Sequence, residues 1–314
     1  MMMRVKLFLI LFNTLQCMTL VTGYRTRFGM KQYVEYQIGS VDSKLILTAP
    51  HGGSLSPTTM PNRTHGCFDN ETEQCIYRHN CGTPTRSKCK VLMATDTNTR
   101  NLAILIADQI EAKTGKRPHV ILNNLGRWKM DANRDADQAA FGVPETKRAY
   151  DEFHEFVNNA KLAISPSSGL LLDIHGVQSH PEAWVELGYR LTKSNLNKNT
   201  VLAEYSSIKN LAATSSYTFE QILRGDKSLG HFMLRENLSF NSRVVPSPDT
   251  PSPGSGGYYR GGYITKHHGS RYAGTIDAIQ IESPRPLRDL LYNGDKAYAI
   301  DLANAVIGFL GVHY

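Results

Sequence analysis

The chain is organised around the stretch Lys44-Leu45-Ile46-Leu47-Thr48-Ala49-Pro50-His51-Gly52-Gly53. Its apolar run, rich in residues that favour β structure, predicts a buried strand. Pro50 lacks the N–H that a sheet ladder needs, and the two glycines let the backbone pass close to another group, so the strand ends there. Such a strand delivers His51 to the edge of a sheet, where a ligand or a catalytic group belongs. The alternative is a turn that happens to contain a histidine.

A second stretch repeats the arrangement: Gly169-Leu170-Leu171-Leu172-Asp173-Ile174-His175-Gly176 is again an apolar strand that ends in His-Gly. If the two strands are parallel, both imidazoles lie on the same edge of the sheet, where open α/β folds keep their sites. This pair of histidines is the strongest functional signal in the sequence.

Strands and helices alternate along the rest of the chain. Helical spacing predicts helices that open at Asp96-Thr97 and Pro144, and a last one capped by Asp295. This alternation favours an α/β fold: a three-layer α/β/α domain with a central, mostly parallel or mixed sheet, of the phosphorylase/hydrolase-like kind. Further strands are expected at 119–122, 184–191 and 278–282, and shorter helices near 218–223 and 227–236.

The first residues indicate export. Arg4 and Lys6 precede an apolar core, and Val21-Thr22-Gly23 offers small residues at a cleavage point, so residues 1–23 read as a secretory signal peptide. A single-pass anchor is the alternative. No later segment is long and apolar enough to span a membrane. Residues 24–314 are therefore expected to form a single, secreted hydrolase-like domain with a Cys-rich insertion at about 54–90. The insertion shows no periodicity, so we expect a long loop that forms a wall beside His51.

Cysteine usage agrees with an oxidising compartment. Four cysteines crowd into the insertion, and we expect two disulfides among them by one of three possible pairings. A zinc knuckle that also uses His65 or His79 is the alternative, although the Cys-x-x-Cys spacing of such sites is missing. The four cysteines are Cys67, Cys75, Cys81 and Cys89.

Charge and sequence patterns narrow the partners. The net charge of +7 is spread among residues of both signs. We find no basic helix and no nucleic-acid module, so a nucleic-acid partner is not expected. Asn-x-Ser/Thr patterns predict glycosylation on surface loops at Asn62, Asn70 and Asn237.

Four residues that can bind a metal ion or transfer a proton lie at expected strand ends or at a strand–helix junction: His51, Asp96, His175 and Glu282. Two imidazoles and one carboxylate are the protein ligands of many hydrolytic zinc ions, whose fourth position holds water. One further carboxylate then suffices as general base, and Glu282 is the candidate. The alternative for Asp96 is a helix N-cap, and for Glu282 a surface acid.

These residues sit in longer motifs. The motifs are Pro50-His51-Gly52-Gly53, Thr95-Asp96, Arg127, Asp131-Ala132-Asn133-Arg134, Asp173-Ile174-His175-Gly176, Gly261-Gly262-Tyr263-Ile264-Thr265-Lys266-His267-His268-Gly269 and Ala278-Ile279-Gln280-Ile281-Glu282. In this order they resemble the N-formylglutamate amidohydrolase family. The resemblance implies an α/β/α fold like that of zinc carboxypeptidases and aspartoacylases. It also implies His51, Asp96 and His175 as metal ligands and Glu282 as base.

The same resemblance implies that Arg127 and Arg134 bind a substrate carboxylate or stabilise the oxyanion. An arginine fork suits both tasks; a structural ion pair of Arg134 with Asp131 is the alternative. We predict Arg127 as catalytic, and Asn133, Arg134 and His267 as substrate-binding, His267 from a Gly-rich loop able to close on substrate.

The resulting function is a secreted zinc hydrolase that cleaves an amide bond next to a carboxylate, in an N-acyl amino acid or at a peptide end. The substrate is not carried over from the family, which commonly has serine where this chain has Gly52. The competing hypothesis is a secreted matrix or biomineral-associated protein that keeps the hydrolase fold without required catalysis. Export, glycosylation signals and net positive charge motivate it.

Overall fold

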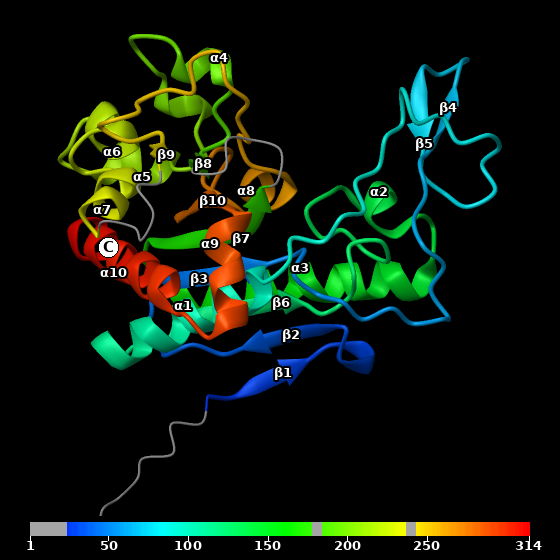
Figure 1. Ribbon diagram of the computed structural model, residues 1–314, viewed down its shortest axis with the longest axis horizontal. Helices are drawn as coiled ribbons and strands as arrows, with labels where there is room; N and C mark the ends of the chain where they lie inside the picture. Colours follow the sequence, from blue (N-terminus) through cyan, green and yellow to red (C-terminus); the bar gives the residue numbers. More distant parts are fainter. Residues whose placement is uncertain (1–23, 178–183, 237–242) are drawn as a thin grey trace, which may run out of the picture.

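The computed structural model describes residues 24–177, 184–236 and 243–314. Within them, eight strands form one mixed sheet in the order β1-β2-β6-β3-β7-β10-β8-β9 (Figure 1). The strands are β1 (Thr26–Phe28), β2 (Val34–Gln37), β3 (Leu45–Ala49), β6 (His119–Asn123), β7 (Gly169–Val177), β8 (Trp184–Gly188), β9 (Arg243–Val245) and β10 (Ile276–Pro284).

The centre of the sheet is parallel. β6, β3, β7 and β10 run in one direction as neighbours, whereas β1–β2, β2–β6 and β10–β8 pair antiparallel. The two histidine-bearing strands, β3 and β7, are direct parallel neighbours, as predicted. The register of β7 and β10 sets Glu282 opposite His175. The carboxyl ends of three central strands therefore meet at one edge.

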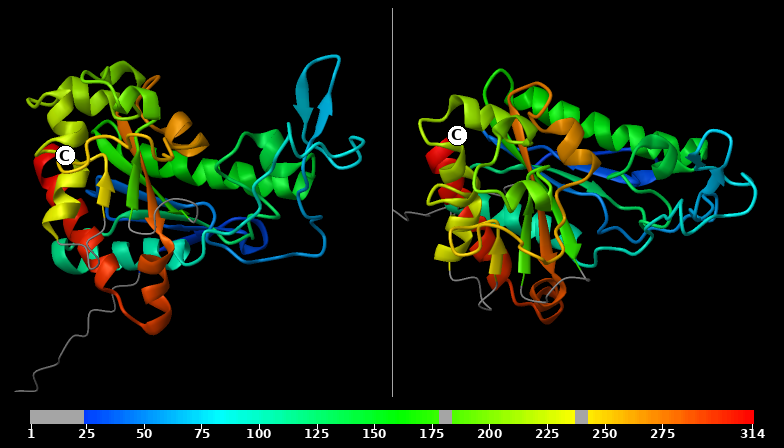
Figure 2. Two further views of the ribbon diagram at one scale, coloured as in Figure 1. Left: turned by 45° about the horizontal axis from the view of Figure 1, so that its top comes forward. Right: turned by 90° about the horizontal axis from the view of Figure 1, so that it is seen from above.

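Helices cover both faces of the sheet. Side chains alternate along β3, so Leu45 and Leu47 join one core and Ile46 joins the other. In the right-hand view of Figure 2, α3 lies on one side of the sheet and α1 and α10 on the other. This is the expected three-layer α/β/α fold. The longer helices are α1 (Thr99–Thr114), α3 (Pro144–Ile164) and α10 (Ala297–His313).

Short elements complete the domain, and none of the described helices is long and apolar enough to cross a membrane. The short α-helices are α2 (Ala136–Ala140), α4 (Lys193–Leu196), α5 (Lys209–Thr214), α6 (Phe219–Arg224), α7 (Leu229–Arg235), α8 (Tyr263–His268) and α9 (Arg285–Asp289). Single 3-10 turns are η1 (Met30–Gln32), η2 (Ala203–Tyr205) and η3 (Leu290–Asn293).

The Cys-rich insertion carries a hairpin of β4 (Cys67–Asp69) and β5 (Gln74–Ile76), which projects from the body of the molecule in Figure 1. The sequence pattern predicts only loop here, because three-residue strands are too short to show alternation. The two expected disulfides are present. Their pairing, open from sequence, is Cys67–Cys81 and Cys75–Cys89. Disulfide bonding leaves no thiolate for a zinc knuckle.

Several element boundaries differ from expectation. The last helix, expected to be capped by Asp295, begins at Ala297 with Lys296 in the N-cap position. Helix α1 begins at Thr99 with Asn98 as its N-cap residue, so Asp96 is not the cap and its side chain points elsewhere. Strand β8 ends at Gly188, three residues early, because Arg190 has a φ of 63° that turns the chain.

Candidate active site

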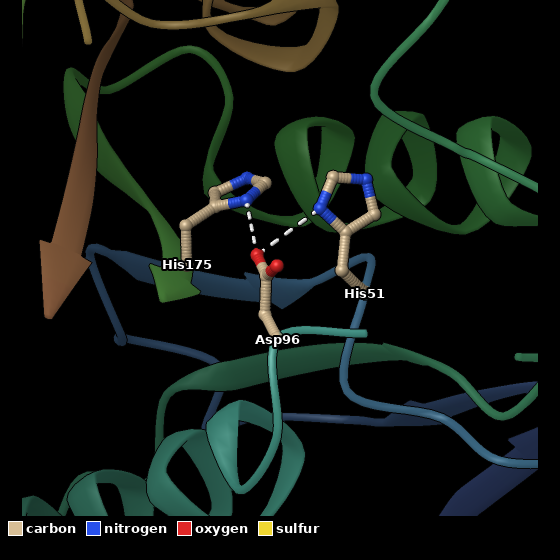
Figure 3. A group of neighbouring side chains, drawn as sticks. All are labelled: His51, Asp96 and His175. Carbon is tan, nitrogen blue, oxygen red and sulfur yellow. Dashed lines mark hydrogen bonds and ion pairs between the residues drawn. The ribbon is translucent and has the colours of Figure 1, made fainter. Parts of the chain in front are cut away.

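Three side chains converge at the carboxyl edge of the sheet (Figure 3). His51 follows β3, Asp96 lies in the loop before α1, and His175 lies on β7. The Nδ1 atoms of His51 and His175 are 3.2 and 3.1 Å from Oδ2 of Asp96, and all three residues are buried. The backbone N–H of Gly176 donates to the same oxygen at 3.2 Å. The structure thus brings the three predicted metal ligands together.

The glycines of the Pro-His-Gly-Gly motif allow this approach. A Cβ on Gly52 would collide with the backbone nitrogen of Arg100 at the start of α1, and one on Gly53 with the carbonyl oxygen of Asn123 at the end of β6. A side chain at Gly52 would therefore push α1, and the loop that carries Asp96, away from His51. Asp96 is fastened in turn by its backbone N–H, which donates to the carbonyl of His51 at 3.1 Å.

Each histidine is held from behind by a second carboxylate. Nε2 of His51 is 2.6 Å from Oδ1 of Asp131, and Nε2 of His175 is 2.8 Å from Oδ2 of Asp173. Both carboxylates are fully buried, and Thr48 donates to the other oxygen of Asp173 at 2.7 Å. A carboxylate behind an imidazole fixes the proton on Nε2 and turns the Nδ1 lone pair forward, as in carboxylate–histidine–zinc arrangements.

The donor set fits a metal ion. With both Nε2 protons given to carboxylates, the two Nδ1 atoms and Oδ2 of Asp96 face one another. They remain hydrogen-bonded only if each imidazole also carries a second proton. When the imidazoles are neutral, three lone pairs converge, and the ligand atoms lie within 4.8 Å of one another. Two nitrogens and one carboxylate oxygen form a typical set for zinc and related divalent ions.

The charges of the group are strongly coupled. Burial disfavours the charge on His175, but Asp173 and Asp96 outweigh it and hold the pKa of His175 well above its usual range. Burial also opposes charge on Asp131, yet Arg127 and His51 hold its pKa well below the ordinary value. The site therefore carries fixed, paired charges in a water-poor environment.

Glu282 stands beside this group on β10, in register with His175. Burial raises its pKa above the usual value, and the nearby carboxylates of Asp96 and Glu186 add to the rise, while His175 opposes it. Nε2 of Gln280 donates to Oε1 of Glu282 at 2.7 Å. Gln280 is itself fixed, because its Oε1 accepts from the backbone of Gly262 at 2.9 Å.

Arg127 is built into the site rather than left free. Its Nε donates to Oδ2 of Asp131 at 2.9 Å, and its Nη1 lies 3.6 Å from Oδ1 of Asp96. The neighbouring Arg134 donates from Nη1 to the carbonyl of Asn133 at 2.7 Å. Among the described contacts Asp131 pairs with Arg127 and, at 3.5 Å, with Arg63, and no Arg134–Asp131 ion pair is found.

Asn133 lies at the centre of this polar wall. Its Nδ2 is 3.1 Å from Nε2 of His175 and 3.2 Å from Oε1 of Gln280, and its Oδ1 accepts from the backbone of Ile264 at 2.8 Å. Predicted as substrate-binding, Asn133 thus also connects β10, through Gln280, to the first turn of α8, through Ile264.

These residues line a cavity of about 460 Å³. His267 does not line it; the ring of His267 stacks on Tyr263 at 3.9 Å. The wall near Asp96 comes from Leu92 and Ala94 instead of from residues 54–90, which we expected to wall the pocket. The predicted residues that do line the cavity are His51, Asp96, Arg127, Asn133, Arg134, His175 and Glu282.

Some residues of the site were not predicted from the sequence. Asp173 and Gln280 each lie two residues before a predicted site residue on the same strand, so the period of two places them on the same face. That spacing is a usable signal. Tyr258, Tyr259 and Arg260 also line the cavity, but from a Pro- and Gly-rich loop that carries no recognisable motif.

Two of the three predicted glycosylation positions lie within the described residues. Asn62 and Asn70 are exposed, as an acceptor on a surface loop must be. Asn237 lies outside the described residues.

Comparisons with known proteins give only distant likenesses. No family model and no curated protein sequence matches the chain. Among solved structures, the gene product Atu2144 from Agrobacterium tumefaciens is 13% identical over 92% of this chain and 100% of its own, with a TM-score of 0.45. N-formylglutamate amidohydrolase from Ralstonia eutropha JMP134 is 14% identical over 87% of this chain and 93% of its own, also with a TM-score of 0.45.

The CwlD amidase from Clostridioides difficile, solved in complex with the GerS lipoprotein, is 13% identical over 86% of this chain and 100% of its own, with a TM-score of 0.31. The family that the motifs of this chain resemble is thus among these structures. At such identities and scores, function has to be argued from the residues of this chain.

Proposed function

We propose that the protein is a zinc-dependent hydrolase of an amide bond that lies next to a carboxylate, in an N-acyl amino acid or at a peptide end. One observation carries the proposal. The Nδ1 atoms of His51 and His175 converge with Asp96 beside the buried Glu282, at the floor of one cavity. Each histidine contacts one carboxylate through Nε2 and a second one, that of Asp96, through Nδ1. Packing alone would not require both contacts.

In this proposal His51, Asp96 and His175 hold the metal. Zinc in such a site supplies Lewis acidity, which polarises a carbonyl group and eases deprotonation of water. Asp131 and Asp173 keep the two imidazoles in the ligating tautomer, which they do through the hydrogen bonds to Nε2. Zinc is proposed over other divalent ions because two nitrogens and one carboxylate are its common hydrolytic ligand set.

Glu282 is the proposed general base. It takes a proton from the attacking water and returns it to the leaving amine, so it must hold a proton transiently. Burial and the neighbouring carboxylates make that protonated form accessible by raising its pKa. The hydrogen bond from Gln280 holds the carboxyl group of Glu282, which lines the cavity, in place.

Positive charge in the cavity supports an anionic substrate. Arg127 and Arg134 line the cavity from the loop between β6 and α2, and the exposed Arg260 lines it from the loop before α8. A guanidinium pairs bidentately with a carboxylate, and one beside the scissile carbonyl stabilises developing negative charge. Arg127 is suited to the second task because Asp131 holds it in place.

The test is a screen of N-acyl amino acids and short peptides with the wild type and Glu282→Gln. Loss of the base should lower kcat by about 10²-fold or more while bound zinc stays at the wild-type level. Glu155→Gln, which changes an exposed glutamate on α3, is the matched control and should keep the wild-type rate. Equal rates for Glu282→Gln and the wild type, or no turnover by any zinc-loaded form, would instead favour the matrix protein.

Export belongs to the same proposal. The two disulfides are compatible with an oxidising compartment. Expression in a eukaryotic secretory system should release the protein into the medium with an N-terminus near Tyr24. Retention of residues 1–23 in the membrane fraction would instead indicate an anchor.

A further inference from the structure

Arg63 is the most deeply buried arginine of the Cys-rich insertion. Its side chain is 1% exposed, although its neighbours Asn62 and Thr64 are exposed. A long charged side chain is rarely buried unless each donor finds a partner. The partners of Arg63 therefore show what the insertion does where it joins the body of the molecule.

The guanidinium of Arg63 hydrogen-bonds to the backbone of the loop after β6. Its Nε and Nη2 both donate to the carbonyl oxygen of Arg127, at 3.1 and 2.7 Å. Its Nη1 donates to the carbonyl of Gln138 at 3.0 Å, and Nη2 also donates to that of Leu92 at 2.8 Å. The backbone N–H of Arg63 donates to the carbonyl of Trp128 at 2.7 Å. Arg63 thus holds three segments in one arrangement.

The same side chain reaches the carboxylate behind His51. Nη2 of Arg63 is 3.5 Å from Oδ2 of Asp131. Asp131 also accepts from Arg127 through Oδ2 and contacts Nε2 of His51 through Oδ1. Burial lowers the pKa of Arg63 to about 10, so the guanidinium stays charged at neutral pH. Two buried cations therefore fix one carboxylate, which fixes one imidazole.

The insertion supports Arg63 from the other side. Gly66 donates from its backbone to the carbonyl of Cys89 at 3.0 Å, and Val91 donates to Nδ1 of His65 at 3.1 Å. The two ends of the insertion are thus fastened together just beyond Arg63, and the Cys75–Cys89 disulfide continues this fastening toward the hairpin. The chain that enters the insertion cannot shift without moving Arg63.

We propose that Arg63 is a positioning residue of the candidate metal centre, through which the Cys-rich insertion fixes Arg127 and Asp131 and so sets the orientation of His51. The inference rests on the proposed function only in that the centre binds a metal ion. It gives the insertion a role in a site whose cavity it does not line. It also predicts an effect at His51 without any contact between Arg63 and a substrate.

The experiment compares Arg63→Met and Arg63→Lys with the wild type. Zinc affinity is measured by competition with a chromophoric chelator, and the Nε2–H signal of His51 is followed by NMR in metal-free, ¹⁵N-histidine-labelled protein. Loss of a residue that supports a metal ligand typically weakens metal affinity by about 10- to 100-fold. We expect such a loss, with a shifted or broadened His51 signal, in Arg63→Met. Arg63→Lys should fall between Arg63→Met and the wild type.

The matched control is Arg86→Met, which removes an exposed arginine from the same insertion and should leave both readouts unchanged. Wild-type zinc affinity and an unchanged His51 signal in Arg63→Met would overturn the proposal, even if that variant unfolds at a lower temperature. If Arg63→Met does not fold, the same two readouts on Arg63→Lys decide. The NMR readout needs neither metal nor turnover, so failure of the proposed function would appear separately, as a wild type that binds no zinc or cleaves no substrate.

Discussion

Buried histidines in this protein differ in the hydrogen-bond partners of their ring nitrogens. His175 lies between two carboxylates, which overcome burial and favour its charged form. His119, at the start of β6, faces two donors instead: its Nδ1 accepts from the backbone of Gly39 at 3.1 Å and from the hydroxyl of Tyr36 at 2.8 Å. Burial lowers the pKa of His119 to about 4. The same residue type is thus prepared for a charged partner in one place and kept neutral in the other.

His119 should therefore make the fold sensitive to acid. The unfolded chain takes up the His119 proton near pH 6.5, whereas the folded chain resists it down to about pH 4. Between these values the unfolded state holds more protons, so the free energy of unfolding falls as the pH falls, by up to about 1.4 kcal/mol per pH unit. The loss is complete only below the folded-state pKa.

The comparison variant is His119→Asn, whose side-chain oxygen keeps an acceptor near the position of Nδ1 but cannot be protonated. Between pH 7 and pH 5, urea unfolding should show a loss of stability about 2 kcal/mol smaller in the variant than in the wild type. The variant itself starts from a lower stability because of its smaller volume. Equal pH dependence in the two proteins would show that another group governs the acid response.

Secondary-structure elements differ in how well they can be predicted from the sequence. β3 and β7 are predictable because an apolar run stops abruptly at His-Gly. Alternation within those strands also leads to the site, since Asp173 precedes His175 by two residues. The β4–β5 hairpin is not predictable, because its three-residue strands are too short to show alternation and each is tied by a disulfide to a segment outside the hairpin. The role of Asp96 becomes clear only from the structure, in which Asn98 and not Asp96 occupies the N-cap position of α1.

The hairpin should be a peripheral contributor to stability. The Cys67–Cys81 disulfide closes a loop of 14 residues outside the sheet, and loss of a native disulfide typically costs about 2 to 5 kcal/mol. We expect the low end, about 2 kcal/mol, for Cys67→Ser with Cys81→Ser, measured by urea unfolding. Zinc affinity should stay at the wild-type value, because Cys75–Cys89 still fastens the base of the insertion. Loss of zinc binding in this double variant would make the hairpin itself part of the metal centre.

At the scale of the whole molecule, the site depends on contacts that no local pattern contains. The α/β/α class follows from the alternation of elements, and the gathering of His51, His175 and Glu282 follows from parallel strands. The contact between Arg63 and Asp131 joins segments 68 residues apart and has no signature in either segment. Buried polar networks of this kind are specified by mutual satisfaction of donors and acceptors, which is a property of the folded chain.

The proposed metal should stabilise the whole domain, because its three ligands come from separate segments that the unfolded chain does not hold together. A ligand that binds only the folded state adds about 4 kcal/mol when its free concentration is 1,000 times Kd. At about 2 to 4 °C per kcal/mol, zinc should raise Tm of the chelator-treated protein by about 10 °C. His175→Ala should show no such rise, whereas His231→Ala, a half-buried histidine outside the cavity, should respond like the wild type. An equal zinc-dependent shift in His175→Ala would mean that the ion binds elsewhere, and the assignment of this centre would fail.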